Sequence, residues 1–460
     1  MRRREFLQAG ASAALAGGAE RRANVVFILT DDHGQWALGC YGNREIQTPA
    51  LDRLGREGAR FTRALAATPV CSPSRATLLT GKLPCQHGIQ DWIQEENVGE
   101  RRVRFLEGQA TLTQALAAHG YKVGLSGKWH LGDSATPQQG FRYWFAMPTG
   151  GSRYQDAEMM WEGKTRVYPG YLTEVITDKA IDFIEQSRRD PFFCFVSYNA
   201  PHTPYSGTPD RYREIYRDSP LQTFPDEPLN PLHTGLARDH HRNRESQITY
   251  YAMITAVDEN VGRILRRLDE LGLRRDTLVV FAADQGFMCG HHGLWGKGNA
   301  SWPFNMYEQS ILMPLLYNHP GRIPAGRTID AMVGSYDFAS TLLDYLGLPP
   351  LGGASYARLL RGERQPWENV LYGEYQYTRM IRDQRWKYVH RTEGFPSEMF
   401  DLSEDPGERR NLVREPGQAR RVAELKARLD AWFAGRGCAS GDSWKSTRQR
   451  LPTYQPRGAG

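Results

Sequence analysis

Two apolar runs of the chain each end in a pair of oxygen-bearing side chains. The runs are NVVFILTDD (24–32) and TLVVFAADQG (277–286), and the four side chains belong to Asp31, Asp32, Asp284 and Gln285. Adjacent buried carboxylates repel each other unless a cation or a hydrogen-bonded loop compensates them. One such pair alone is typical of a turn or a helix cap. Two pairs together predict an oxygen-rich site that suits Ca²⁺ or Mg²⁺ rather than zinc.

Basic side chains follow apolar runs in the same way or occur in a glycine-rich loop. They are Lys128, His130, His202 and Lys297. Each residue alone is typical of a solvated loop. On converging loops, however, the four would form a cationic pocket that holds an anion beside the metal and protonates a leaving group.

A cysteine precedes a predicted helix in TPVCSPSRATLLTGK, residues 68–82. Pro73 is typical of a first helical turn, which places Cys71 at the helix N-terminus, where backbone N–H groups favour negative charge. This environment lowers the pKa of a thiol, so one hypothesis is a catalytic cysteine with His130 or His202 as its base. The alternative is a small buried residue that only begins the helix.

The elements that must position these side chains alternate between strands and helices. Four runs without polar alternation, at 24–32, 121–130, 192–202 and 277–286, predict strands buried on both faces of a parallel sheet. Helical spacing and capping residues predict helices at 111–120, 173–187 and 247–271. Because ligands bind beyond the carboxyl ends of parallel strands, we expect the polar clusters to meet there.

The pattern predicts an α/β fold with two structural parts. Residues 23–360 form the expected α/β catalytic domain. From residue 361 to 440 the apolar runs become shorter and partly alternating, which predicts a small antiparallel sheet with a final helix at 417–434. Residues 441–460 are expected to be a loosely ordered tail.

The first 22 residues resemble an export signal. They combine a basic start with twin arginines, a short apolar stretch and small residues. We expect export to the periplasm, by the twin-arginine route. The alternative is an ordinary basic N-terminus without regular structure.

The composition excludes several classes of protein. The net charge of +6 comes without a long Lys/Arg run, which disfavours nucleic-acid binding but suits an anionic substrate. Because no apolar run reaches the roughly 20 residues that span a bilayer, we expect no stable membrane insertion. The six cysteines are scattered without CxxC spacing, so we expect mostly free, buried thiols. The sequence does not indicate an oligomeric state.

The segment CSPSRATLLTG (71–81) matches the pattern C-x-P-S-R-x-x-x-L-T-G at every fixed position. Together with DD, GKWH, a PH-containing loop, DxG and a later lysine in this order, it makes residues 24–440 resemble type I, formylglycine-dependent sulfatases of the alkaline-phosphatase-like superfamily, the arylsulfatase family. The resemblance implies a large, mostly parallel sheet flanked by helices, with a smaller C-terminal antiparallel sheet and a helix. It also implies a sulfuric ester hydrolase that releases inorganic sulfate.

The resemblance further implies that Cys71 is not used as a thiol. In this family the cysteine is oxidised by a separate maturation enzyme to Cα-formylglycine, whose hydrate attacks sulfur. Residue 71 would bind the metal, Ca²⁺ or alternatively Mg²⁺, together with Asp31, Asp32, Asp284 and Gln285. The remaining implied site residues are Arg75 and Lys128, which steady residue 71 and the sulfate, His130 as the base, and His202 and Lys297 beside the leaving alcohol. Gln285 departs from the Asn or His of many members.

Two other functions remain open at this point. The same chemistry serves phosphonate and phosphate ester hydrolases, and an exported anion-binding module without catalysis is a third hypothesis, disfavoured by the complete set of site residues. An exported family member favours a sulfated carbohydrate substrate, as in polysaccharide degradation. The segments 150–155, 291–308 and 371–388 are rich in aromatic residues, arginine and glycine, and they either line the mouth of the site or serve packing.

Overall fold

The computed structural model describes residues 22–454, so the expected export signal lies almost entirely outside the described residues. A mixed sheet forms the centre of the molecule, in the order β11-β2-β10-β8-β1-β7-β3-β4-β5-β6, with β9 paired to β2. Its strands are β1 (Asn24–Thr30), β2 (Ala59–Leu65), β3 (Lys122–Gly127), β4 (Tyr143–Ala146), β5 (Glu158–Trp161), β6 (Lys164–Val167), β7 (Phe192–Ser197), β8 (Thr277–Ala283), β9 (Leu312–Met313), β10 (Leu315–Asn318) and β11 (Arg327–Gly334).

The four predicted strands are neighbours in this sheet. They are β8, β1, β7 and β3, and they pair in parallel, which confirms the expected arrangement. Antiparallel pairs occur on both sides of this group, at β10 and at β4–β5–β6. The absence of alternation in the apolar runs has a direct cause: in β1, Val26 packs into one core and Val25 into the other, so both faces are buried.

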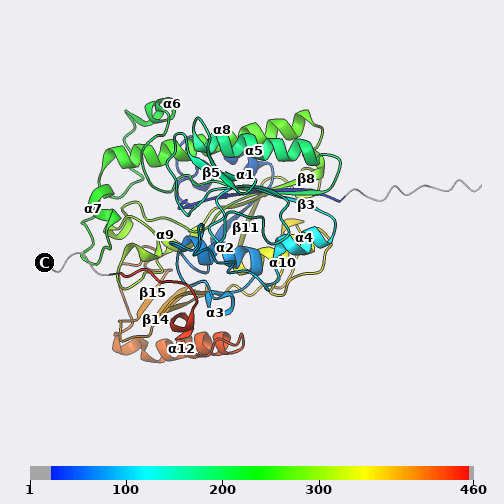
Figure 1. Ribbon diagram of the computed structural model, residues 1–460. Helices are drawn as coiled ribbons and strands as arrows, with labels where there is room; N and C mark the ends of the chain where they lie inside the picture. Colours follow the sequence, from blue (N-terminus) through cyan, green and yellow to red (C-terminus); the bar gives the residue numbers. More distant parts are fainter. Residues whose placement is uncertain (1–21, 455–460) are drawn as a thin grey trace, which may run out of the picture.

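Helices cover both faces of the sheet (Figure 1). On one face lie the long helices α5 and α8, and on the other lie α2, α4 and α10. The helices are α1 (Pro49–Arg56), α2 (Cys71–Thr80), α3 (Pro84–His87), α4 (Leu112–Ala118), α5 (Leu172–Ser187), α6 (Asp210–Arg213), α7 (Leu236–His240), α8 (Arg244–Glu270), α9 (Glu308–Ile311), α10 (Phe338–Tyr345), α11 (Ala357–Leu360) and α12 (Ala419–Ala434). The helices predicted at 111–120, 173–187, 247–271 and 417–434 are therefore present. None of the helices in residues 22–454 is long and apolar enough to cross a bilayer.

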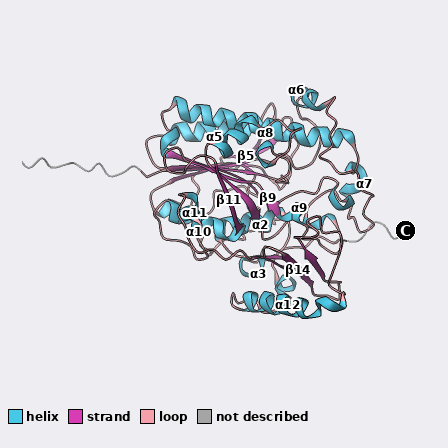
Figure 2. Cartoon of the chain, turned by 180° about the vertical axis from the view of Figure 1, so that it is seen from behind, coloured by secondary structure: helices cyan, strands magenta, loops and turns pink. Residues whose placement is uncertain are grey.

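A separate antiparallel sheet lies below α2 and α3, with α12 packed on its far face (Figure 2). Its strands follow the chain order β12 (Leu371–Tyr375), β13 (Thr378–Arg382), β14 (Trp386–Arg391) and β15 (Glu398–Asp401). This confirms the small sheet and the final helix expected from the change of pattern near residue 360.

The cysteine prediction is wrong for one pair. Cys85 and Cys438 form a disulfide across 353 residues of sequence, whereas Cys71, Cys194 and Cys289 are free and buried, and Cys40 is free and half-buried. Sequence spacing does not indicate such a bond, because only the packing of α12 against the small sheet brings the end of α12 to α3.

The end of the chain differs from the expected loose tail. Within residues 441–454, the Gln449 side chain is buried, accepts hydrogen bonds from the backbone N–H of Gln90 (2.9 Å) and Asp91 (3.0 Å), and donates one to the Asp91 carbonyl. Tyr454 Oη lies 3.0 Å from Trp92 Nε1. Polar side chains, rather than an apolar pattern, attach this segment to the large domain.

Candidate active site

The four parallel strands bring the predicted polar clusters to one edge of the large sheet. Asp31 and Asp32 follow β1, Asp284 and Gln285 follow β8, Lys128 and His130 follow β3, and the loop with His202 follows β7. Helix α2 begins at Cys71 beside these strand ends. All of these side chains are buried except that of His202, which is 21% exposed.

Arg75 holds the strand ends together from the first turns of α2. Its guanidinium donates to Asp31 Oδ2 (2.9 Å) and to Asp284 Oδ2 (2.9 Å). It also donates to Ser197 Oγ (2.8 Å) and to the Lys128 carbonyl oxygen (3.2 Å). One buried cation therefore joins the ends of β1, β8, β7 and β3, and a guanidinium provides the several fixed donors that this requires. Nothing in the sequence distinguishes Ser197 from an ordinary strand residue.

The carboxylates are balanced by lysines. Asp31 Oδ2 lies 2.5 Å from Lys128 Nζ, and Asp32 Oδ1 lies 2.6 Å from Lys297 Nζ. Burial raises the pKa of Asp31, but the positive charges of Lys128, Lys297 and Arg75 outweigh it and hold the pKa well below its usual range. Asp31 is therefore ionised at neutral pH.

Asp284 differs from Asp31 although both bind Arg75. Burial, followed by the negative charge of Asp31, raises the pKa of Asp284 to about 8. Without another cation, the surrounding basic groups do not stabilise all three neighbouring carboxyl groups in the ionised form at the same time. An added divalent ion would therefore favour the ionised form of Asp284.

The surroundings of Cys71 contradict the thiolate hypothesis. Burial raises the pKa of the Cys71 thiol, and the charges of Asp31 and Asp284 act in the same direction against Lys297 and Lys128. The largest influence on this pKa is the loss of hydration in the enclosed site, and not the helix N-terminus that the sequence suggested. The hydrogen-bond partner of Cys71 Sγ is Lys297 Nζ at 3.0 Å, not a histidine.

His130 has one buried ring nitrogen without a hydrogen-bond partner among residues 22–454. Its Nε2 donates to the Ile93 carbonyl oxygen at 2.8 Å, since a carbonyl only accepts. Nδ1 makes no hydrogen bond within the described part of the chain. Burial, then the charge of Lys128, lowers the pKa of His130 well below its usual value. The neutral ring thus offers an Nδ1 lone pair that can accept a proton.

His202 is the partly exposed histidine of the site. Its Nδ1 donates to the Thr203 carbonyl oxygen at 2.7 Å, and its Nε2 lies 3.8 Å from Asp32 Oδ2. Tyr154 Oη donates to the His202 carbonyl oxygen at 2.7 Å. Tyr154 belongs to the segment 150–155, for which the sequence left lining of the mouth and packing open; its side chain is buried in the core and contacts the backbone of His202.

The oxygen atoms of the site fit a hard divalent cation. Asp31 Oδ1 and Gln285 Oε1 are buried and accept no hydrogen bond from any residue within 22–454. Ligand atoms of Asp31, Cys71 and His202 lie within 4.8 Å of one another. Gln285 Nε2 donates to Asp32 Oδ1 at 2.7 Å, which leaves Oε1 of the same amide available. Carboxylate and amide oxygens of this kind suit Ca²⁺ or Mg²⁺.

Two residues that the sequence did not indicate, Ile93 and Tyr454, form hydrogen bonds to site residues or to residues close to them. Ile93, whose carbonyl oxygen binds His130, donates its own N–H to Ser72 Oγ at 3.0 Å. Tyr454 Oη accepts from Asn299 Nδ2 (3.1 Å), two residues beyond Lys297. In the segment 371–388, by contrast, Tyr375 and Tyr377 pack in the core. Neither Ile93 nor Tyr454 carries a sequence signal, because one acts through its backbone and the other across most of the chain.

Residues 23–348 match the family model described as Sulfatase. The chain belongs to the sulfatase family. Residues 290–434 also match the model described as N-sulphoglucosamine sulphohydrolase, C-terminal. Together with relatives that are themselves named sulfatases, these matches identify the protein as a sulfuric ester hydrolase.

Two relatives of this sulfatase and one solved structure have names or ligands that indicate sulfated saccharides. An N-acetylglucosamine-6-O-sulfatase of Bacteroides thetaiotaomicron is 29% identical over 89% of this chain and 86% of its own length. An ulvan-active sulfatase of Formosa agariphila is 31% identical over 94% of this chain and 84% of its own length. A solved structure in complex with D-glucosamine-2-N,6-O-disulfate superposes with a TM-score of 0.77 at 26% identity, covering 93% of this chain and 99% of the other.

A phosphonate monoester hydrolase of Agrobacterium radiobacter shares the fold of this sulfatase. It superposes with a TM-score of 0.70 at 23% identity, over 90% of this chain and 96% of the other. At this identity the likeness concerns the architecture, which unrelated chemistries can share.

Proposed function

We propose that this sulfatase releases inorganic sulfate from a sulfated carbohydrate, with residue 71 in the formylglycine form and a divalent metal ion bound beside it. The observation that carries the proposal is the placement of Cys71. It starts α2 inside a buried cluster of three carboxylates and three cations, where its thiol pKa is raised. A thiol in this place is a poor nucleophile, while the CxPSR pattern around it is the modification signal of the family.

The proposed metal ligands are residue 71 together with Asp31, Asp32, Asp284 and Gln285. Their free oxygens, Asp31 Oδ1 and Gln285 Oε1, support this assignment. When bound, Ca²⁺ or alternatively Mg²⁺ would neutralise charge on the sulfate oxygens and make a hydroxyl group at residue 71 more acidic. We prefer Ca²⁺ because carboxylate and amide oxygens from separate loops are a ligand set that Ca²⁺, with its flexible coordination, accepts more readily than Mg²⁺.

The chain's own residues provide charge, orientation and proton transfer. Arg75 and Lys128 bind the ends of the strands and keep Asp31 ionised. Their contacts fix the orientation of the Asp31 carboxylate. His130 Nδ1 is free to take a proton from a hydroxyl group at residue 71. We assign the assistance of the leaving alcohol to buried Lys297, whose Nζ donates hydrogen bonds, and to partly exposed His202, whose Nε2 would donate after gaining a second proton against the effect of burial.

The sugar substrate and the cellular location are supported by separate observations. The N-acetylglucosamine-6-O-sulfatase and the ulvan-active sulfatase, as relatives, favour a sulfated carbohydrate and polysaccharide degradation. The Cys85–Cys438 disulfide supports export to the periplasm, because such bonds persist in oxidising compartments. The partners that follow are the sulfated substrate and the maturation enzyme that converts Cys71.

The deciding experiment combines mass spectrometry with a substrate screen. The chain is produced together with a formylglycine-generating enzyme, and the mass of the peptide that contains residue 71 is measured. Sulfate release is then measured on sulfated mono- and oligosaccharides. We expect the aldehyde at residue 71, sulfate release that Cys71→Ala abolishes and Cys71→Ser nearly abolishes, and loss of rate on chelation that Ca²⁺ restores. Full activity with an unmodified Cys71 would refute the mechanism. Faster turnover of an aryl phosphonate than of an aryl sulfate would instead favour the phosphonate hydrolase alternative.

A further inference from the structure

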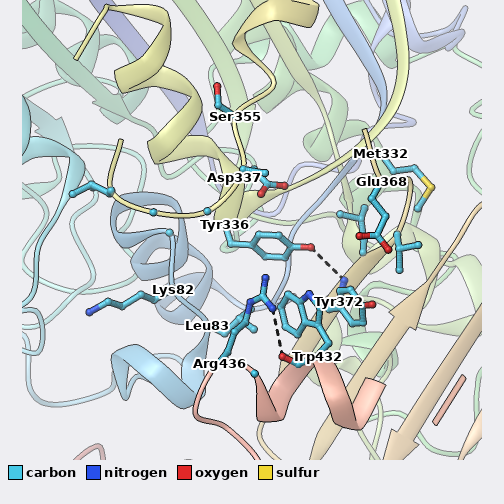
Figure 3. Close-up of a pocket in the computed structure, with 18 of the residues that line it drawn as sticks. Lys82, Leu83, Met332, Tyr336, Asp337, Ser355, Glu368, Tyr372, Trp432 and Arg436 are labelled. Carbon is cyan, nitrogen blue, oxygen red and sulfur yellow. Dashed lines mark hydrogen bonds between the residues drawn. The ribbon is translucent and has the colours of Figure 1, made fainter. Parts of the chain in front are cut away.

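A cavity lies away from the proposed catalytic residues, between the large domain and the small sheet with α12. Its volume is about 740 Å³, within the range of about 300–1,000 Å³ that is usual for small-molecule sites. Thr80 and Gly81, at the end of α2 opposite Cys71, contribute to its wall. Since α2 has ten residues, this cavity lies roughly 15 Å from residue 71. We call it the α2–α12 cleft, and Figure 3 shows its lining.

Two cations line the α2–α12 cleft without a carboxylate partner among residues 22–454. They are Lys82 and Arg436. Lys82 Nζ donates to the amide oxygen of Gln109 at 3.2 Å, and Arg436 Nη1 donates to the Trp432 carbonyl oxygen at 3.4 Å. Both hydrogen bonds are to neutral oxygens, and the charge of Arg436 also lowers the pKa of the nearby Asp337 carboxyl group against the effect of burial.

Aromatic stacking fixes the guanidinium group in place (Figure 3). Arg436 Cζ lies 3.6 Å from the centroid of the Trp432 ring, and Trp432 stacks on Tyr372 with ring centroids 4.1 Å apart and planes within 12°. Tyr336 Oη accepts from the Tyr372 N–H at 3.4 Å. A guanidinium held on aromatic rings loses less freedom when it binds an anion than a mobile one does.

A covalent bond holds the two cation-bearing walls together. Cys85, three residues after Lys82, forms the disulfide with Cys438, two residues after Arg436. Beside it, Gln86 Nε2 donates to the Arg436 carbonyl oxygen at 3.3 Å. The two chain segments that carry these cations are therefore linked before any ligand arrives.

The acidic groups of the α2–α12 cleft are already engaged. Glu368 Oε1 lies 3.9 Å from Arg428 Nη2, and Asp337 Oδ2 accepts the Gly334 N–H at 3.0 Å. Burial raises the pKa of Asp337 to about 7, so this carboxyl group carries only part of a negative charge near neutral pH, which favours an anion over a cation in the cleft.

We propose that the α2–α12 cleft is a second, non-catalytic site that binds a sulfate-bearing unit of a saccharide chain. The choice of a saccharide rests on the proposed function, while the choice of a sulfate group rests on Lys82 and Arg436. Arginine and lysine bind sulfate oxygens through charge-assisted hydrogen bonds. A site of this kind would keep a long sulfated chain on the enzyme between catalytic events.

The test measures binding separately from turnover. Full-length Cys71→Ala protein, which cannot turn over substrate, is titrated calorimetrically with a heparin hexasaccharide and with its desulfated counterpart. We expect that adding Lys82→Gln and Arg436→Gln weakens binding of the sulfated chain at least tenfold, and that Lys82→Gln alone weakens it about threefold. The matched control is Arg420→Gln in the first turn of α12, the helix that ends two residues before Arg436; the Arg420 side chain is 92% exposed and paired with Glu424. It should bind like the parent.

Turnover then separates failure of this site from failure of the proposed function. In the mature enzyme, Lys82→Gln/Arg436→Gln should keep the rate on a small aryl sulfate within twofold and lose at least fivefold in kcat/KM on the hexasaccharide. Unchanged binding in this variant, equal loss in Arg420→Gln, or equal binding of the desulfated chain would overturn the inference. The absence of any sulfate release by the mature parent enzyme would instead overturn the proposed function. The single variant Lys82→Gln keeps the test valid if replacing Arg436 disturbs folding.

Discussion

Gly150 is a residue at which one added methyl group should disable the site. A Cβ atom at residue 150 would lie 2.1 Å from both Cε1 and Nε2 of His130. Since ordinary carbon contacts begin near 3.4 Å, the imidazole would have to move by roughly 1.3 Å. The atom that meets the methyl group, Nε2, is the one that donates to the Ile93 carbonyl oxygen.

The expected loss follows from this displacement. Misplacing a catalytic group by about 1 Å costs on the order of 100-fold in rate, and removing a general base costs about 10²–10⁴-fold. We therefore expect Gly150→Ala to lower kcat by at least about 100-fold. The orphaned Ile93 carbonyl oxygen should also lower the free energy of unfolding by about 1–3 kcal/mol.

The neighbouring glycine provides the matched control. A Cβ at residue 151 would lie 3.8 Å from His202 Cε1, an ordinary contact, and neither glycine has a positive φ that alanine would strain. Gly151→Ala should keep kcat within about threefold. The assay is sulfate release from an aryl sulfate, normalised to the formylglycine content of each preparation.

A double-mutant cycle tests the cause directly. If Gly150→Ala acts by displacing His130, the same substitution in a His130→Ala background should change kcat by less than about threefold. Equal losses from Gly150→Ala in both backgrounds, or equal losses from Gly150→Ala and Gly151→Ala, would refute the reasoning.

Three further predictions concern distant parts of the structure. Cys85→Ser/Cys438→Ser should lower the free energy of unfolding by about 2–5 kcal/mol in urea titration, and a reductant should destabilise the parent protein but not this variant. Burial raises the pKa of Asp91 to about 7, so the folded protein holds a proton that the unfolded chain releases near pH 4. Asp91 therefore lowers the free energy of unfolding as pH rises from 4 to 7, by up to about 1.4 kcal/mol per pH unit. In Asp91→Asn the free energy of unfolding should fall less steeply with pH over this range. The same slope in both proteins would contradict this prediction. Ending the chain after Ser446 removes Gln449 and Tyr454, which hold the loop with Ile93, and should lower kcat at least tenfold; unchanged kinetics would show that the tail does not position His130.

Much of the large domain could be predicted because its signals are local. In β1 and β8 every residue is buried, and such strands need continuous apolar runs that are visible without any knowledge of their neighbours. Pro73 in the first turn of α2 marked the helix that begins at Cys71. Parallel pairing then required the polar residues after these strands to lie at one edge of the sheet.

The chemistry at Cys71 could not be predicted from local rules alone. A helix N-terminus lowers a thiol pKa in general, yet the pKa of Cys71 is raised, because burial removes more stabilisation from a thiolate than Lys297 and Lys128 restore. The degree of enclosure depends on four loops and is not encoded near residue 71. Only the signature around Cys71 indicated a use other than a thiolate.

The sequence by itself determined four buried strands, four helices, the charged residues that follow the strands, and the CxPSR signature, since these depend on neighbouring residues and on simple periodicity. The tertiary structure decided the four-fold contact of Arg75, the free nitrogen of His130, the disulfide across 353 residues and the attachment of the tail. These features join segments far apart in the chain through individual hydrogen bonds and one covalent bond. No periodicity or compositional bias of the sequence marks such contacts, so they can be identified only in the folded structure.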